Sequence, residues 1–308
     1  MRTVQAVLQI RYGMSGFVVK LGEKLAERWV SLLVLPGALF VGVLGVAAAL
    51  GQPNALDAAL LVRKVQMWST GLANQSAAVV LGLVGVLLAA AGAGLVAQTL
   101  GLMVERLWLI EWPRHLTAPF VGLRRRRWEK AHDKFTDAQA TEGETAEDFD
   151  NRRGLLAAAR NRIALAMPTH PTWMGDRIAA AATRVHNEYG LDAHAAWPRL
   201  WLVISEETRS TVRAARVAFT DSAALVGWSL MYLAVGVAMW WPAILVSVVL
   251  LVVGHRKGRE AAATYADLVE SVFDVHGTDL AEALRVPTGD SLTPLVGHVI
   301  SERLRKGA

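Results

Sequence analysis

The sequence predicts an all-α membrane protein with four transmembrane helices, a cytoplasmic helical domain between helices two and three, and a cytoplasmic helical tail. First, 53% of the 308 residues are hydrophobic and only 19% are charged, whereas soluble domains carry about 25% charged residues. Second, several uncharged apolar runs are long enough to cross a bilayer. Third, no segment of useful length alternates polar and apolar residues as a half-buried strand would. Tryptophan, which is favoured at bilayer interfaces, outnumbers Phe and Tyr at 11 residues against 7 and 4.

Residues 1–28 precede the first apolar run and carry charges throughout. Apolar residues recur there at helical spacing, at Met14, Val18, Leu21 and Leu25. This pattern predicts a cytoplasmic amphipathic segment that lies along the membrane surface. Packing of the same face on the protein's own soluble domain is an equally good interpretation.

Residues 29–112 contain the first two predicted spans. Trp29–Leu50 has no charged residue, and its length suits one membrane crossing better than the short core of a cleaved signal peptide. The second uncharged run, Ser76–Val104, exceeds what a bilayer requires. We expect a tilted helix that continues past the headgroups and stops before Pro113.

Residues 223–254 form the third uncharged run, which is interrupted at Trp240–Pro242. The run predicts either one long helix or a hairpin, and the basic residues favour the hairpin. Lys and Arg number 5 in residues 1–28, 2 in 51–75, 8 in 105–134 and 3 in 255–259. Four spans place every basic-rich segment on the cytoplasmic side, as the positive-inside rule requires, whereas three spans would export the last one.

Two further regions complete the predicted cytoplasmic part, and the sequence predicts helices in both. Residues 113–222 form the domain between helices two and three, in which the acidic stretch 137–150 predicts a mobile loop. Residues 255–308 form the tail. The expected helices of both regions are 151–167, 172–189, 193–202, 206–239 running into span three, an extension of span four through 275, and 292–305.

Short motifs in residues 168–305 resemble a family of bacterial multi-pass integral membrane proteins with the Ala/Arg-rich style of actinobacteria. The motifs are Pro168-Thr169, Pro171-Thr172, Gly175-Asp176, Tyr189–Asp192, Trp197–Leu200 and Phe273–His276. The resemblance implies the bacterial inner membrane as the location, and it implies no activity and no catalytic residue.

Three polar residues of the cytoplasmic part are candidates for binding a partner or ligand: Asp176, Asp192 and Arg199. The structural alternative makes Asp192 a helix N-cap and Arg199 a surface ion-pair partner. The segment His186–His194 offers imidazoles and carboxylates, but it lacks the spacing of a zinc protease, and helix-end polarity explains it better. We therefore expect no metal and no cofactor.

A basic cluster, Arg124–Arg127, is the candidate for binding anionic lipid headgroups. It comprises Arg124, Arg125, Arg126 and Arg127, and each basic residue near a membrane contributes about 1 kcal/mol. The cluster also suffices as a determinant of topology. Nucleic acid is not an expected partner, because no binding motif accompanies the cluster and acidic residues follow it.

Small residues four apart in the second span predict close helix packing, within one chain or between copies: Ala89, Ala90, Ala93 and Gly94. The predicted membrane cores hold no ionisable residue, which argues against ion-coupled transport. The chain has no cysteine, which excludes thiolate catalysis and Cys-ligated metals.

No catalytic residue emerges, so we do not expect an enzyme. We expect a membrane-anchored protein that presents its cytoplasmic domain to an unknown protein for interaction or sensing. The alternative is a homo-oligomeric channel or pore, which requires self-association.

Overall fold

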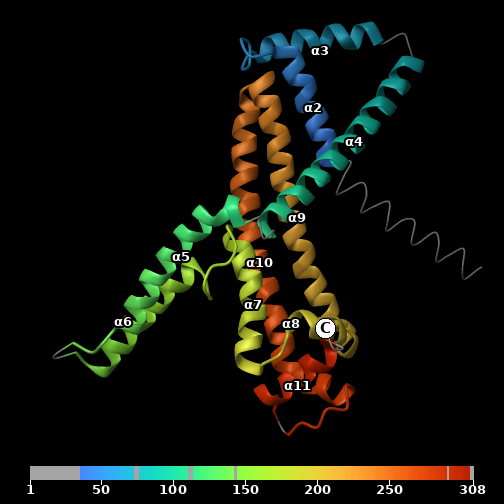
Figure 1. The fold of residues 1–308 in the computed structure, drawn as a ribbon. Coiled ribbons are helices and arrows are strands. Elements are labelled where there is room, and N and C mark those ends of the chain that lie inside the picture. Colours follow the sequence, from blue (N-terminus) through green and yellow to red (C-terminus); the bar gives the residue numbers. More distant parts are fainter. Residues whose placement is uncertain (1–34, 73–75, 110–113, 142–143, 290, 306–308) are drawn as a thin grey trace, which may run out of the picture. The chain divides into compact units, whose positions relative to one another are not determined.

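A computed structural model of the chain describes residues 35–72, 76–109, 114–141, 144–289 and 291–305 (Figure 1). Every regular element in these residues is an α-helix, so the all-α prediction is confirmed for them. The amphipathic segment predicted before residue 29 and the start of the first span lie outside the described residues.

The chain divides into two compact units. Unit 1 takes residues up to Gly101 and the segment Ala224–Val252, and unit 2 takes the segment Leu102–Ala223 and the residues from Val253 onward. The helices α4, α9 and α10 each contribute residues to both units. The boundaries fall close to where the uncharged runs of the sequence end.

Unit 1 contains α2 (Leu35–Leu50), α3 (Ala58–Leu72) and the first part of α4 (Ser76–Leu109). By length and hydropathy, two described helices can cross a membrane, Ala77–Leu109 and Glu206–Ala238. These two helices weakly support membrane association, and the prediction of four spans is not confirmed. The helix α3 was not predicted from the sequence.

The remaining part of unit 1 is a helical hairpin. The helix α9 (Glu206–Ala238) ends and α10 (Pro242–Ala283) begins on either side of the predicted interruption at Trp240. Ser229 and Ser247 join the two helices, since each hydroxyl donates to the other residue's carbonyl, at 3.0 and 2.8 Å. The helix α10 continues to Ala283, past the end predicted at residue 275.

Unit 2 begins with a pair of adjacent helices, α5 (Arg114–Thr136) and α6 (Ala146–Ile163) (Figure 1). The helix α6 starts five residues before the predicted position, so the acidic loop predicted over 137–150 is too long. The Thr145 hydroxyl accepts a hydrogen bond from the Asp148 backbone N–H at 3.2 Å and caps the helix. Acidic side chains in the first turn suit the positive end of the helix dipole, so the charges that suggested a loop instead stabilise a helix start.

The rest of unit 2 packs α7 (Trp173–Tyr189), α8 (Ala193–Val203) and α11 (Pro294–Arg305) with the polar parts of α9 and α10. These starts and ends lie within two residues of the predicted ones. The core shared by these helices is made of large buried side chains: Val185, Leu191, Leu200, Ile204, Val212, Val272, Phe273, Leu280 and Ile300.

Candidate functional site

Asp176, one of the three predicted partner-binding residues, is the centre of a buried polar cluster. Its carboxylate accepts hydrogen bonds from the backbone N–H groups of Thr169 and His170, at 2.8 and 2.7 Å. It also pairs with the Arg124 guanidinium at 2.6 Å. Burial tends to raise the pKa of this carboxyl, but the hydrogen bonds from His170, Thr169 and Arg124 outweigh burial and lower it. Asp176 therefore holds the segment before α7 against α5.

The four arginines of the predicted lipid-binding cluster lie on α5 and differ in their surroundings. Arg124 binds Asp176 and the Ile163 carbonyl, and Arg125 donates to the Pro168 carbonyl at 2.9 Å. Arg126 and Arg127 are exposed. Arg124 and Arg125 thus have a structural role inside unit 2, while Arg125, Arg126 and Arg127 are all exposed on its surface.

The three predicted partner-binding residues do not form one site. Asp176 lies in the first turn of α7 and Asp192 follows its end, so at 1.5 Å per residue they are about 20 Å apart. Asp192 caps α8 by accepting from the Ala195 N–H, and it pairs with Arg305 at 2.9 Å. Arg199 donates to the carbonyl of Ala195, on its own helix, rather than to a carboxylate.

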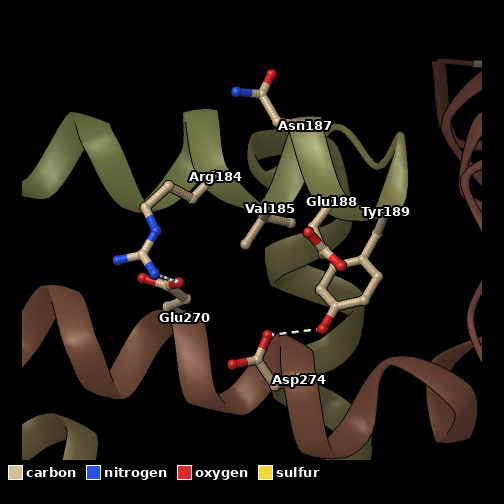
Figure 2. Close-up of a pocket in the computed structure, with 7 residues that line it drawn as sticks. All are labelled: Arg184, Val185, Asn187, Glu188, Tyr189, Glu270 and Asp274. Atoms are coloured by element: carbon tan, nitrogen blue, oxygen red, sulfur yellow. Dashed lines mark hydrogen bonds and ion pairs between the residues drawn. The ribbon is translucent and has the colours of Figure 1, made fainter. Parts of the chain in front are cut away.

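A polar pocket of about 340 Å³ lies between α7 and α10 and includes part of the histidine-containing segment (Figure 2). Arg184 pairs with Glu270 at 2.9 Å, and the Tyr189 hydroxyl donates to Asp274 at 2.9 Å. Burial, aided by the Asp274 carboxylate, raises the pKa of Tyr189 to about 12. These four side chains satisfy one another's hydrogen-bonding groups. We therefore interpret the pocket as a polar contact between two helices rather than as a binding site.

Metal binding finds no support in the part of the chain that the structure describes. No group of three or more His, Cys, Asp or Glu side chains converges there to hold a metal ion. Gly190 ends α7 in the left-handed conformation (φ 64°), so the histidine-containing segment is divided between two helices as expected.

A second concave surface, absent from the sequence predictions, is an open aromatic groove of about 530 Å³ in unit 2. We define the aromatic groove by the residues that line it from α8, α9 and α10: Trp197, Pro198, Trp201, Val212, Arg213, Arg216, Val217 and Tyr265. The Trp197 and Trp201 rings lie 5.5 Å apart, centre to centre. The groove therefore offers planar apolar walls together with two guanidinium groups.

The two arginines of the aromatic groove are held over aromatic rings. The Arg213 guanidinium lies 5.5 Å from the centre of the Trp201 ring, and the Arg216 guanidinium lies 6.0 Å from that of Tyr265. Arg213 pairs with Glu206 at 2.7 Å, and Arg216 pairs with Glu105. Such stacking orients a guanidinium while leaving its other N–H groups available.

Arg216 retains unused hydrogen-bonding capacity. Its Nη1 atom is buried and has no hydrogen-bond partner among the described residues, and the same holds for Oε2 of Glu105. Buried polar atoms nearly always find a partner, and an unsatisfied one costs about 1–3 kcal/mol. Both atoms belong to the Arg216–Glu105 ion pair, so they bear on that pair rather than on a ligand. The aromatic groove is the best candidate for a binding site because two tryptophans, Tyr265 and the exposed Arg213 line one open surface.

The predicted helix-packing residues of α4 differ in their surroundings. Ala90 and Gly94 are buried, Ala93 is half-buried and Ala89 is exposed. A side chain at Gly37 of α2 would meet the Ala90 carbonyl at 2.0 Å, so the backbones of α2 and α4 are in contact there. Ala90 and Gly94 thus pack within the chain.

Sequence reasoning missed the aromatic groove because its walls come from three helices. One signal was available, since Trp197 and Trp201 are four apart on one helix, and so are Arg213 and Val217. That spacing predicts an aromatic face on the first helix and a face with a basic and an apolar residue on the second. It does not show that the two faces lie against each other.

Comparison with known proteins gives no match: no protein-family model, no curated protein and no solved structure is significantly similar to this chain.

Proposed function

We propose that this chain is a membrane-anchored interaction or sensing protein whose cytoplasmic helical domain, unit 2, presents the aromatic groove to a partner. The observation that carries the proposal is the groove itself, which combines two neighbouring tryptophans with two arginines that lie over aromatic rings. Interaction hot spots are rich in Trp, Tyr and Arg for these physical reasons. The fitting partner segment carries a carboxylate beside an apolar or aromatic side chain.

The membrane anchor is supported by the surface of α4. In the most apolar window of Ala77–Leu109, only 11% of residues are buried, although the mean hydropathy is 2.5. Soluble proteins seldom expose an apolar surface of this length, because each Å² left in water costs about 25 cal/mol. Lipid is the natural solvent for such a helix.

In the proposed topology, four spans cross the bacterial inner membrane and both termini lie in the cytoplasm. The spans are α2 with the uncharged residues before it, α4, the apolar part of α9, and the apolar start of α10. The fourth span is short, and the tryptophans at the hairpin turn together with local thinning of the bilayer would accommodate it.

Topology is tested by single cysteines, for which a chain without cysteine has no background. Asn54, Ala140 and Ala283 are exposed, so failure to react there reflects location rather than burial. A membrane-impermeant thiol reagent added to intact cells should label Asn54→Cys only, and all three after permeabilisation. Labelling of Ala283→Cys in intact cells would mean three spans.

The partner site is tested by photo-crosslinking in cells from Val217, which lines the aromatic groove and is 42% exposed. The matched control is Leu155 on α6, an exposed apolar residue away from the groove. We expect a discrete crosslinked product from Val217 alone, lost when Arg213 is changed to Glu. Equal products from both positions would refute the groove as the site.

The mass of the particle extracted in mild detergent separates this function from the alternative pore. A monomer or dimer agrees with a membrane-anchored interaction protein. A closed ring of three or more copies would favour a homo-oligomeric pore, and conductance in a planar bilayer would then decide.

A further inference from the structure

The charged residues of unit 1 are confined to one short stretch. Among its described residues, Asp57, Arg63 and Lys64 are the only Asp, Glu, Lys or Arg side chains. All three lie at the start of α3 or within it. The rest of unit 1 is uncharged, so α3 is the one described helix of this unit that is built for contact with a polar phase.

The helix α3 is amphipathic. Leu61, Val65 and Trp68 recur at the spacing of one helix face, while Arg63 and Gln66 lie on another. Val65 and Trp68 are about half exposed, at 50% and 52%, so the described part of unit 1 leaves much of this face uncovered. Such a face needs a partner that is apolar on one side and polar on the other.

Hydrogen bonds hold α3 at one end of unit 1. The Lys64 Nζ donates to the Ala49 carbonyl in the last turn of α2, at 2.5 Å. The segment leading into α3 is tied to the α9–α10 turn, because the Trp240 indole N–H donates to the Ala55 carbonyl at 2.8 Å. Figure 1 shows α3 running across the ends of α2 and of the hairpin, rather than alongside these helices.

We propose that α3 is an interfacial helix that lies in the headgroup layer of the membrane on the non-cytoplasmic side, with its Leu61, Val65 and Trp68 face in the lipid. This inference rests on the proposed membrane anchor. Apolar helices that cross the bilayer end at the headgroups, which is where Trp240 and α3 lie. An amphipathic helix at that depth buries its apolar face about 5–10 Å into the acyl boundary.

Three observations favour a lipid surface as the partner of the apolar face of α3. The apolar face of α3 belongs to the same unit as the exposed apolar surface of α4, so one bilayer can cover both. Arg63 is exposed and has no ion-pair or hydrogen-bond partner among the described residues, which suits a lipid phosphate. Tryptophan is also the residue most favoured at this depth.

The test uses the full chain in vesicles of phosphatidylcholine and phosphatidylglycerol, with a nitroxide on single cysteines placed at each position from 61 to 68. Accessibility to oxygen, which concentrates in lipid, and to a water-soluble nickel complex is measured at each site. We expect oxygen accessibility with helical periodicity, highest at Leu61, Val65 and Trp68, and several-fold higher nickel accessibility at Arg63 and Gln66.

A probe at Leu81 of α4, which is exposed and lies in the proposed span, separates the two proposals. Lipid exposure at Leu81 with uniform water exposure along α3 would overturn the interfacial helix and leave the anchor intact. Protection of the Leu61 face from both reagents would mean that protein covers α3, which also overturns it. Water exposure at Leu81 would refute the membrane anchor itself.

Discussion

Removal of the Asp176 carboxylate should open the segment before α7 without unfolding the rest of unit 2. The carboxylate is 4% exposed and accepts from two backbone N–H groups, and its partner Arg124 is 21% exposed. Asp176→Ala leaves both N–H groups of Thr169 and His170 without their acceptor, and it leaves a largely buried guanidinium unpaired.

The expected cost is about 3–5 kcal/mol, the range for breaking a buried ion pair by removal of one partner. Each orphaned N–H alone accounts for about 1–3 kcal/mol. Arg124 keeps its bond to the Ile163 carbonyl and some contact with water, which favours the lower end of this range. Since 1.4 kcal/mol is a factor of ten, amide protection at Thr169 and His170 should fall by roughly 100-fold or more.

Hydrogen exchange read by mass spectrometry on the full chain in detergent measures this loss directly. The peptide that contains Thr169 and His170 should exchange faster in Asp176→Ala, while peptides from α8 keep their protection. The control is Asp137→Ala, an exposed carboxylate whose loss should cost less than about 0.5 kcal/mol. Unchanged protection in Asp176→Ala would refute the reasoning that this cluster holds the segment in place.

Three further predictions concern packing, hydrogen bonding and pH. Gly227→Ala should destabilise unit 1, because the added Cβ would lie 2.3 Å from a backbone oxygen of α4. The control Gly82→Ala adds a Cβ that meets no atom, and it should stabilise its helix by about 0.5–1 kcal/mol. Denaturation in mixed micelles measures the stability of both variants. Ser229→Ala should cost about 0.6 kcal/mol, the mean for hydrogen bonds between membrane helices. Adding Ser247→Ala should cost a further similar amount in the same titration, because the Ser247 hydroxyl donates separately to the Ser229 backbone carbonyl, and no further loss would contradict this. Because Asp176 has a lowered pKa in the folded chain, its contribution to the free energy of unfolding should be complete above about pH 4 and lost as the pH falls further. In thermal melting over that pH range, Asp176→Asn should lose less stability than the unmodified chain. Equal losses of stability would contradict this.

Local sequence signals predicted most helices of the described fold. The hairpin turn at Trp240 and the ends of α7, α8 and α11 followed from prolines, glycines and capping side chains, all of which act within one helical turn. The errors were also local. The acidic residues near Asp148 read as a loop by composition, yet at a helix N-terminus the same charges stabilise the helix.

Site predictions fared differently, because a site depends on which helices meet. Arg124 and Asp176 were assigned to two separate surfaces, to lipid and to a partner, and the structure pairs them with each other. The aromatic groove needs α8, α9 and α10 together, and no spacing along the chain encodes that contact. The residue types indicated which polar and aromatic groups are present. The packing of the helices decided which of these groups bond to each other and which remain accessible to a partner.

The sequence by itself determined the all-α class, the uncharged runs and most helix ends, since hydrophobicity, charge and capping depend on neighbouring residues. Only the tertiary structure decided that Ala90 packs inside the chain, that Asp176 is satisfied internally and that Trp197, Trp201 and Tyr265 line one groove. Burial and hydrogen bonding are properties of residues far apart in the chain. They set the cost of each polar group, and therefore determine which side chains are left to act on a partner.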